Sequence, residues 1–326
     1  MRRLCLFLTA LSLGCVDPDA PATQADATEV TFQVPSGATA RGIGPTLVEE
    51  GLVSGEFGWT LYLRRNPDEA TCLKAGRFLL RRDMSMREVM STLCGTPLPE
   101  DVPFTVLEGW RIRDIDGALA EKGWIVAGAY TKIAESKAVA LPFPIESATL
   151  EGFLYPETYM VTPPPRFQPE DLIERQLKTF DERFRVPNAG NLDARGLHAV
   201  VVVASMVERE ERTDANRPMV AGVLWKRLDH GWQLGVDATS RYPLEDWTDN
   251  NAFVRRLRDP DDPYNTRLRK GLPPTAIGNP SLRSLEAALH PEDSPWWFYL
   301  HDHDGVFHGA RTGDDHDANR ARYGVY

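Results

Sequence analysis

The sequence predicts an α+β protein in which a small strand-and-helix domain precedes a larger mixed α/β domain. Three observations support this. Strand and helix patterns alternate over residues 30–96, and a Gly-Thr-Pro-Leu-Pro segment at 95–99 then has the composition of a hinge. Beyond it, the almost wholly apolar segment 197–207 lies among amphipathic helices and short strands. The chain of 326 residues is long enough for two domains, the larger with a full core.

The small domain begins with a strand at 29–34, because Val30, Phe32 and Val34 alternate with polar residues. Near its end, Ser85 and Glu88 have the spacing of a capping box, and apolar residues follow at helical spacing. The elements expected between these two are helices at 43–53 and 59–64 and a strand at 77–80.

The larger domain begins with a strand at 104–106. Residues 142–165 are dense in proline and aromatic residues, so they cannot form a regular helix. After 228 the chain is polar and turn-rich to about 280, and we expect no helix in the His/Asp-rich C-terminal tail. The remaining expected elements are helices at 112–122, 169–185, 197–211, 218–228 and 282–289 and a strand at 296–300.

The N-terminus is typical of an exported protein. Arg2 and Arg3 precede an apolar run, 4–16, that is shorter than the about 20 residues needed to span a bilayer. Its end, Leu-Ser-Leu-Gly-Cys, resembles a bacterial lipoprotein signal, which would make Cys15 the lipidated residue; an ordinary cleaved signal is the alternative. We expect residues 1–15 to be a signal segment and 16–29, rich in Asp, Ala, Pro and Thr, to be a linker from the membrane.

In an exported chain, the two cysteines outside the signal segment can form a disulfide. Cys72 and Cys94 form an even pair in an oxidising compartment, and a disulfide between them would contribute about 3 kcal/mol. Two buried free thiols are the alternative.

The formal net charge of −10 argues against nucleic acid as a partner and against charge-driven binding to anionic lipid. Any anionic polymer must therefore be held by short-range contacts.

Glu208 is the strongest candidate for a catalytic residue in the sequence. Nine of the eleven residues from 197 to 207 are apolar or alanine, and on a helix Glu208 shares a stripe with Val201, Ala204 and Ser205. A carboxyl at the edge of an apolar wall should have a raised pKa, as a glycosidase acid requires. The alternative is a buried helix that ends in a solvated charge cluster.

Five blocks of the chain, in order, resemble the YceG-like (MltG-type) family of endolytic murein transglycosylases. The likeness runs from about residue 30 to the end of the chain. The blocks are 106–109 (Val-Leu-Glu-Gly), 150–159 (Leu-Glu-Gly-Phe-Leu-Tyr-Pro-Glu-Thr-Tyr), 204–210 (Ala-Ser-Met-Val-Glu-Arg-Glu), 263–266 with 271–274, and 279–280 with 284–285 and 287–288.

The resemblance implies a LysM-like domain at 30–97 and a transglycosylase catalytic domain at 98–326. It implies internal cleavage of peptidoglycan between N-acetylmuramic acid (MurNAc) and N-acetylglucosamine (GlcNAc), leaving 1,6-anhydro ends and terminating nascent strands. Glu208 would be the catalytic acid and base, with no cofactor and no metal. Implied partners are glycan strands and cell-wall synthases, with the protein periplasm-facing and anchored to the membrane by its N-terminal lipid.

A second carboxylate would instead indicate a hydrolase, since ordinary glycosidases use a pair. Glu108, Glu151, Glu157 and Asp237 are the acids in matching blocks. We interpret Glu151, which is also among the substrate-binding candidates, as a structural or positioning residue, because the adjacent Gly152 suggests a tight turn. The rivals are a hydrolase with Asp237 or Glu151 as partner and a non-catalytic peptidoglycan-binding or scaffold protein.

Other residues in these blocks are expected to shape a sugar groove. Tyr155 and Tyr159 would stack on sugar rings or bond hydroxyls, with core packing as the alternative. Asn265 and Thr266 would contact acetamido groups, with turn capping as the alternative. The resemblance adds three further substrate-binding candidates: Gln233, Asp237 and Thr239, with Ala238 replacing the family's proline.

The tail departs most from the family pattern. Thr312 and His316 keep the family's spacing, whereas the match of His308 is ambiguous. The acidic and His residues at 302–303 and 314–316 fit no zinc or calcium spacing, so a polar strand-and-turn surface is expected there.

Overall fold

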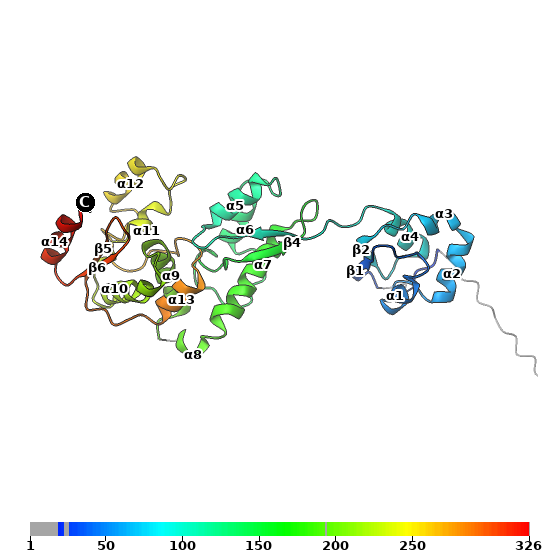
Figure 1. The fold of residues 1–326 in the computed structure, drawn as a ribbon, viewed down its shortest axis with the longest axis horizontal. Coiled ribbons are helices and arrows are strands. Elements are labelled where there is room, and N and C mark those ends of the chain that lie inside the picture. The colour runs from blue at the N-terminus through cyan, green and yellow to red at the C-terminus, as the bar shows by residue number, and fades with distance from the viewer. Residues whose placement is uncertain (1–18, 23–25, 193, 326) are drawn as a thin grey trace, which may run out of the picture. The chain divides into compact units, whose positions relative to one another are not determined.

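The protein was analysed as a computed structural model, which describes residues 19–22, 26–192 and 194–325 (Figure 1). The chain divides into two compact units, residues 1–101 and 102–326. Each unit combines helices with small antiparallel sheets, one in the first unit and two in the second, so the predicted α+β class is confirmed.

The first unit is built on a two-stranded antiparallel sheet. Its strands are β1 (Glu29–Val34) and β2 (Gly76–Arg81), paired from Glu29 opposite Arg81 to Val34 opposite Gly76. The strand residues that face inward pack on a core centred on Trp59, which is fully buried and donates its indole N–H to the carbonyl of Ala40. The helices are α1 (Gly44–Glu49), α2 (Glu56–Arg65), α3 (Pro67–Thr71) and α4 (Met86–Cys94).

Local signals explain most of this unit. The predicted capping box is present at the start of α4, where Ser85 and Glu88 bond each other's backbone N–H groups. The short helix α3 was not predicted; it begins with Pro67, which suits the first turn because its missing N–H is not needed there. A disulfide joins Cys72 to Cys94, with 5.1 Å between the two Cα atoms.

The N-terminal predictions lie largely outside the described residues, including the signal segment and Cys15. Of the expected linker, residues 19–22 and 26–29 are described, and two of their acids pair with the first unit: Asp19 with Arg87 and Asp26 with Arg82. None of the described helices is both long and apolar enough to cross a membrane.

The second unit has two further antiparallel pairs. The strand β3 (Val102–Thr105) pairs with β4 (Thr158–Val161), and β5 (Phe298–His301) pairs with β6 (Phe307–Ala310). The helices before the central one are α5 (Ile112–Glu121), α6 (Ala129–Ser136), α7 (Pro169–Phe180), which continues as a π-helix at Asp181–Arg185, and α8 (Ala189–Leu192).

The central helix is α9 (Leu197–Glu210), as predicted. Every residue from Val200 to Val207 is buried, and the helix packs against α10 (Arg217–Asp229) and α13 (Leu282–Leu289). Ser205 joins it to the 275–279 segment, since its hydroxyl accepts the N–H of Ile277. The core of the unit therefore forms around the helix whose last turn carries Glu208.

Several helices of the second unit were not predicted. They are α6, α11 (Asp237–Arg241), α12 (Asn250–Leu257) and α14 (Gly313–Tyr323). The expectation of a tail without a helix is therefore wrong. A capping box between Thr312 and Asp315 starts α14, which has no fully buried residue and so lacks the apolar stripe by which a helix is recognised in sequence.

Candidate active site

Glu208 lies in the last turn of α9, beside the N-terminus of α13. Its side chain is 8% exposed. The Oε2 atom accepts hydrogen bonds from the N–H of Ser281 at 2.9 Å, from the Ser281 hydroxyl at 2.6 Å and from Arg217 Nη1 at 2.9 Å. Ser281 is the N-cap of α13, so the carboxylate also lies at the positive end of a helix dipole.

This surrounding corrects the expected charge of Glu208. Burial acts to raise the pKa of the carboxyl, as predicted, but the hydrogen bonds from Ser281 and the positive charge of Arg217 outweigh it, and the pKa is lowered. In the free protein Glu208 is therefore a carboxylate at neutral pH, not a protonated acid. The apolar residues of α9, which raise the pKa, can be recognised in the sequence. Ser281 and Arg217, which lower the pKa, belong to two other helices.

Two loops cross beside Glu208. The Gly109 N–H donates to the Asn279 carbonyl at 2.7 Å, and the Asn279 N–H donates to the Trp110 carbonyl at 2.8 Å. The crossing is so close that a Cβ on Gly278 would lie 2.5 Å from the Gly109 carbonyl oxygen. The loop at 107–110 is thereby fixed next to the carboxylate: a Cβ added to Gly109 would lie 3.5 Å from Glu208 Cγ.

Asn279 connects three of the blocks that carry the family resemblance. Its Oδ1 accepts the N–H groups of Gly152 and Leu154, and its Nδ2 donates to the Trp110 carbonyl. The blocks at 106–109 and 150–159 therefore meet at Asn279, two residues before Ser281, which bonds Glu208 of the block at 204–210.

Glu151 lies in the turn that follows Leu150, and its fully buried side chain points to the N-terminus of α5. Its carboxyl accepts the N–H of Ile112 and the hydroxyl of Tyr242, and burial raises its pKa to about 7. It borders an open pocket of about 350 Å³ that is also lined by Arg111 and Arg113. These contacts hold the carboxyl within the protein, which favours the interpretation of Glu151 as a positioning residue. Gly152 has a φ of +90°, as a tight turn at this point requires.

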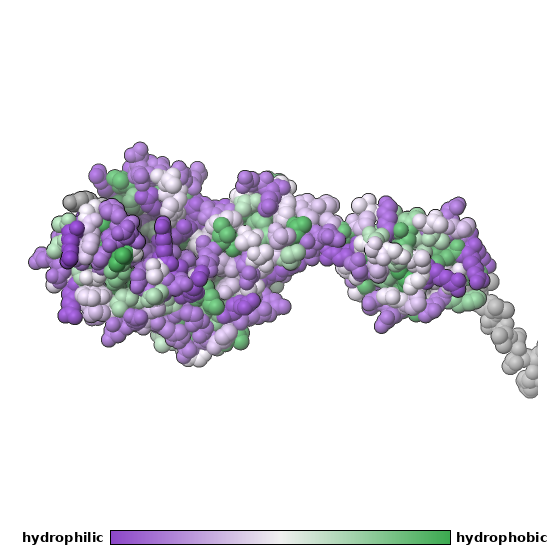
Figure 2. Space-filling view, viewed as in Figure 1, coloured by the Kyte–Doolittle hydropathy of each residue, from purple (hydrophilic) through white to green (hydrophobic). Residues whose placement is uncertain are grey.

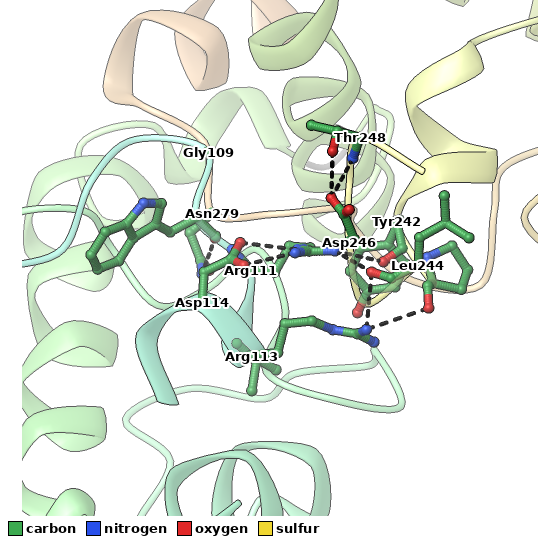
Figure 3. Close-up of polar contacts among 12 residues, drawn as sticks. Gly109, Arg111, Arg113, Asp114, Tyr242, Leu244, Asp246, Thr248 and Asn279 are labelled. Carbon is green, nitrogen blue, oxygen red and sulfur yellow. Dashed lines mark hydrogen bonds and ion pairs between the residues drawn. The ribbon is translucent and has the colours of Figure 1, made fainter. Parts of the chain in front are cut away.

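Arg111 and Arg113 tie this helix start to the segment 242–244 (Figure 3). Arg111 is held by Asp114 and donates to the carbonyls of Tyr242 and Leu244, while Arg113 reaches the Leu244 carbonyl. One wall of the pocket is therefore fixed by arginine-to-carbonyl bonds.

Tyr155 and Tyr159 were candidates for stacking on sugars, and the structure instead favours core packing. Both rings belong to the main hydrophobic core, Tyr159 is 6% exposed, and its hydroxyl donates to the carbonyl of Tyr155. Neither ring presents an open face to a ligand.

The remaining substrate-binding candidates form a separate cluster. Thr239 and Thr266 are buried and bond each other through their hydroxyls at 3.0 Å. Asn265 is fully buried: its Oδ1 caps its own turn by accepting the N–H groups of Arg267 and Leu268, and its Nδ2 donates to the carbonyls of Arg256 and Asp259. Asn265 and Thr266, expected to contact acetamido groups, and Thr239, a further substrate-binding candidate, thus all have their polar side-chain atoms engaged within the protein, which favours a structural role for them.

Gln233 and Asp237 are the members of that cluster that reach solvent. Gln233 is exposed and forms a β-bridge with Lys270, and Asp237 forms an ion pair with Arg267. These two remain available to a ligand.

The His and Asp residues of the tail pair with neighbours. His308 bonds Asp302 and stacks on Tyr323, and His316 stacks on Phe298. Across residues 19–22, 26–192 and 194–325, no three His, Cys, Asp or Glu side chains gather in a way that could hold a metal ion.

Sequence reasoning missed three residues of this site: Arg217, Ser281 and Asn279. Asn279 lies in a matching block, and Ser281 follows two residues later, before Leu282 and Leu285 at helical spacing, which is an N-cap signal. Arg217 has no comparable local signal, because its importance comes from contacts across three helices.

The family's sequence profile matches residues 32–322. The chain belongs to the YceG-like family. Among its relatives, this YceG-like protein is 25% identical over 329 residues to an endolytic murein transglycosylase of Bacillus subtilis, covering 93% of this chain and 87% of that one. It is also 27% identical over 325 residues to an endolytic murein transglycosylase of Streptococcus pneumoniae, covering 90% of this chain but only 58% of that one.

A solved YceG-like protein from Listeria monocytogenes shares the fold. The two align with a TM-score of 0.57 and 24% identity, over 90% of this chain and 99% of the other.

Proposed function

We propose that this protein is an endolytic peptidoglycan lytic transglycosylase that cleaves the bond between MurNAc and GlcNAc and leaves 1,6-anhydro-MurNAc ends. Relatives named endolytic murein transglycosylase support the proposal, as do the bonds that join two further family blocks to Asn279, two residues before the Ser281 that bonds Glu208. The observation that carries it is the buried carboxylate itself, held by Ser281 and Arg217 at the end of α9.

Glu208 acts twice in the proposed reaction. Its protonated form donates a proton to the glycosidic oxygen, and the bonding pair between that oxygen and C1 leaves with the oxygen, which becomes a hydroxyl of the released sugar. The 6-hydroxyl oxygen then bonds C1, and its proton returns to Glu208. The balance needs no water and no second carboxylate, in contrast to hydrolases.

The hydrogen-bond partners of Glu208 suit the stage of the proposed reaction between the two proton transfers. Between the two transfers the side chain is a carboxylate, and Ser281 and Arg217 are arranged to stabilise that form. Because the same partners lower the pKa of Glu208, only a small fraction of this side chain is protonated in the free protein at neutral pH. The proton-donating step should therefore speed up as the pH falls toward the lowered pKa.

The wider role belongs to the same proposal. We place the protein outside the cytoplasm, lipid-anchored at Cys15, where it releases nascent strands made by cell-wall synthases. Residues 30–97 would serve as a LysM-like domain and 98–326 as the catalytic domain.

The test is a Glu208→Gln variant on uncrosslinked nascent glycan strands. We expect it to fold normally and to lose about 10²–10⁴-fold of the anhydro-product rate, since an amide can neither donate nor accept this proton. Glu121→Gln, at an exposed glutamate of α5 outside the family blocks, serves as the control and should keep the wild-type rate. Mass spectrometry identifies the chemistry, because a hydrolase product is heavier by one water; a fully active Glu208→Gln variant would overturn the proposal.

A further inference from the structure

Arg217 is the most deeply buried cation beside the proposed acid. It is the first residue of α10, and its side chain is 6% exposed. Its Nη1 atom lies 2.9 Å from Glu208 Oε2 and 3.4 Å from the Ser281 hydroxyl, and it also donates to the Ser284 hydroxyl. Every partner of Nη1 is therefore a neighbour of Glu208 or Glu208 itself.

A chain of charges continues from Arg217 to the surface. Its Nε lies 3.2 Å from Asp214 Oδ1 without hydrogen-bond alignment. Asp214 pairs with Arg283, and Arg283 pairs with Glu108 in the loop beside the site. These outer side chains are 46–55% exposed, so solvent and salt screen their pairing, whereas the inner pair is buried.

The other charges around Glu208 do not replace Arg217. Arg209, on the same helix, turns away to donate to the Gly109 carbonyl and stacks over Trp247. Arg283 on α13 faces Glu208 from the exposed rim and is paired with two acids, Asp214 and Glu108. Of the cations that α9, α10 and α13 bring to this point, Arg217 is the one in direct contact with the Glu208 carboxylate.

We propose that Arg217 is a positioning residue for the transglycosylase reaction, which holds Glu208 in the ionised form between its two proton transfers. The inference rests on the proposed function and adds a residue to it. The free protein then already contains the ion pair that forms between the two proton transfers, after Glu208 has donated one proton and before it receives the next.

Replacing Arg217 should then have two effects: the pH limb of kcat/KM should shift upward, and kcat should fall. Without the cation, Glu208 binds its proton more tightly, so the pH limb of kcat/KM that reports this group moves upward. The stabilised carboxylate is lost as well, so kcat at the new optimum falls. A residue with a merely structural role would lower activity at every pH without moving the limb.

The experiment compares the wild type with Arg217→Met and Arg217→Lys. The carboxyl of Glu208 is titrated by ¹³C NMR, with Glu208→Gln to assign the signal, and kcat/KM is measured against pH on glycan strands. We expect Arg217→Met to move both the titration and the limb upward by about one pH unit or more, with at least a tenfold lower kcat. Arg217→Lys keeps the charge but loses the planar contact, so it should move both by less.

Arg195→Met is the matched control, since it removes an arginine–carboxylate pair with Asp229 on the exposed surface. It should leave the Glu208 titration unchanged. If Arg217→Met does not fold, Arg217→Lys decides alone through its smaller shift.

An unchanged titration and limb in the folded variants would overturn the role of Arg217. The titration needs no activity, so its result stands apart from the proposed function, which fails instead if the wild type makes no anhydro product.

Discussion

Glu208 shows how a single residue's chemistry depends on groups far away in sequence. Its stripe of apolar neighbours on α9 predicts a raised pKa, and burial does act in that direction. Ser281 and Arg217 supply three hydrogen bonds to one oxygen, and charge-assisted hydrogen bonds are among the strongest available to a carboxylate. The balance between burial and these bonds sets the pKa.

Glu151 presents the opposite balance, and it leads to a prediction about stability. Burial raises its pKa in the folded protein to about 7, above its value in the unfolded chain. The folded state therefore holds a proton that the unfolded state releases between about pH 4.5 and 7, and the stability from this group, present below that window, is lost as the pH rises through it. The expected loss is about 3 kcal/mol.

Denaturant unfolding of the wild type and of Glu151→Gln at a series of pH values measures this loss. The difference between the two free energies should change across the window and level off on both sides. Parallel pH curves for the two proteins would show that Glu151 does not titrate there.

At the scale of elements, α9 and α13 meet through a helix cap that also serves the site. Ser281 accepts the N–H of Ser284 to cap α13 and donates twice to Glu208. One serine thus links the start of one helix to the end of another.

Ser281→Ala should therefore have two effects. Loss of the cap should cost about 1 kcal/mol of unfolding free energy, and loss of the hydroxyl bond should raise the pKa of Glu208. Calorimetry and the pH limb of kcat/KM measure the two effects. Ser136→Ala, which removes an exposed serine hydroxyl bonded within α6, should produce neither, and a Ser281→Ala enzyme with an unmoved limb would contradict the prediction.

The turn at 150–154 is the second element-scale constraint. Gly152 has a φ of +90°, and a Cβ there would lie 2.5 Å from Ala276 Cβ and 2.6 Å from Val201 Cγ1. Gly152→Ala should cost about 3 kcal/mol through backbone strain and overpacking against α9. Thermal unfolding measures it, and Gly190→Ala, which meets no atom within 4 Å, should change stability little.

At the scale of the whole molecule, the two units have separate cores and different means of support. The larger unit forms around α9, whereas the smaller has a core around Trp59 and the disulfide between Cys72 and Cys94. Hydrophilic residues cover most of the visible face of the larger unit, whereas the visible face of the smaller unit mixes hydrophilic, intermediate and hydrophobic residues (Figure 2).

The disulfide should stabilise only the unit that contains it. The Cys72→Ser, Cys94→Ser double variant should lower the unfolding free energy of residues 19–101 by about 3 kcal/mol. Hydrogen exchange followed by mass spectrometry resolves the units separately. Faster exchange throughout 102–326 would contradict the prediction.

The elements that could be predicted from the sequence are those with strong local signals. Strand β1, helix α13 and the capping box of α4 were predicted correctly, since alternation, helical spacing and cap residues are encoded within a few positions. Helix α14 was missed because its surface is polar on nearly all sides, whereas the short, amphipathic α12 was missed because it lies within a segment that is polar and turn-rich as a whole. Tyr159, Asn265 and Thr266 were in the right blocks but are buried, and burial is a property of the packed chain.

The sequence by itself determined the class of the fold, the central helix and the carboxyl at its end, because apolar periodicity and residue order are local. Only the tertiary structure decided the charge of that carboxyl. Arg217 and Ser281 come from the starts of two other helices, and packing α10 and α13 against α9 places them on Glu208. The electrostatic energy of a buried group depends on distance in space, which the order of residues along a chain does not specify.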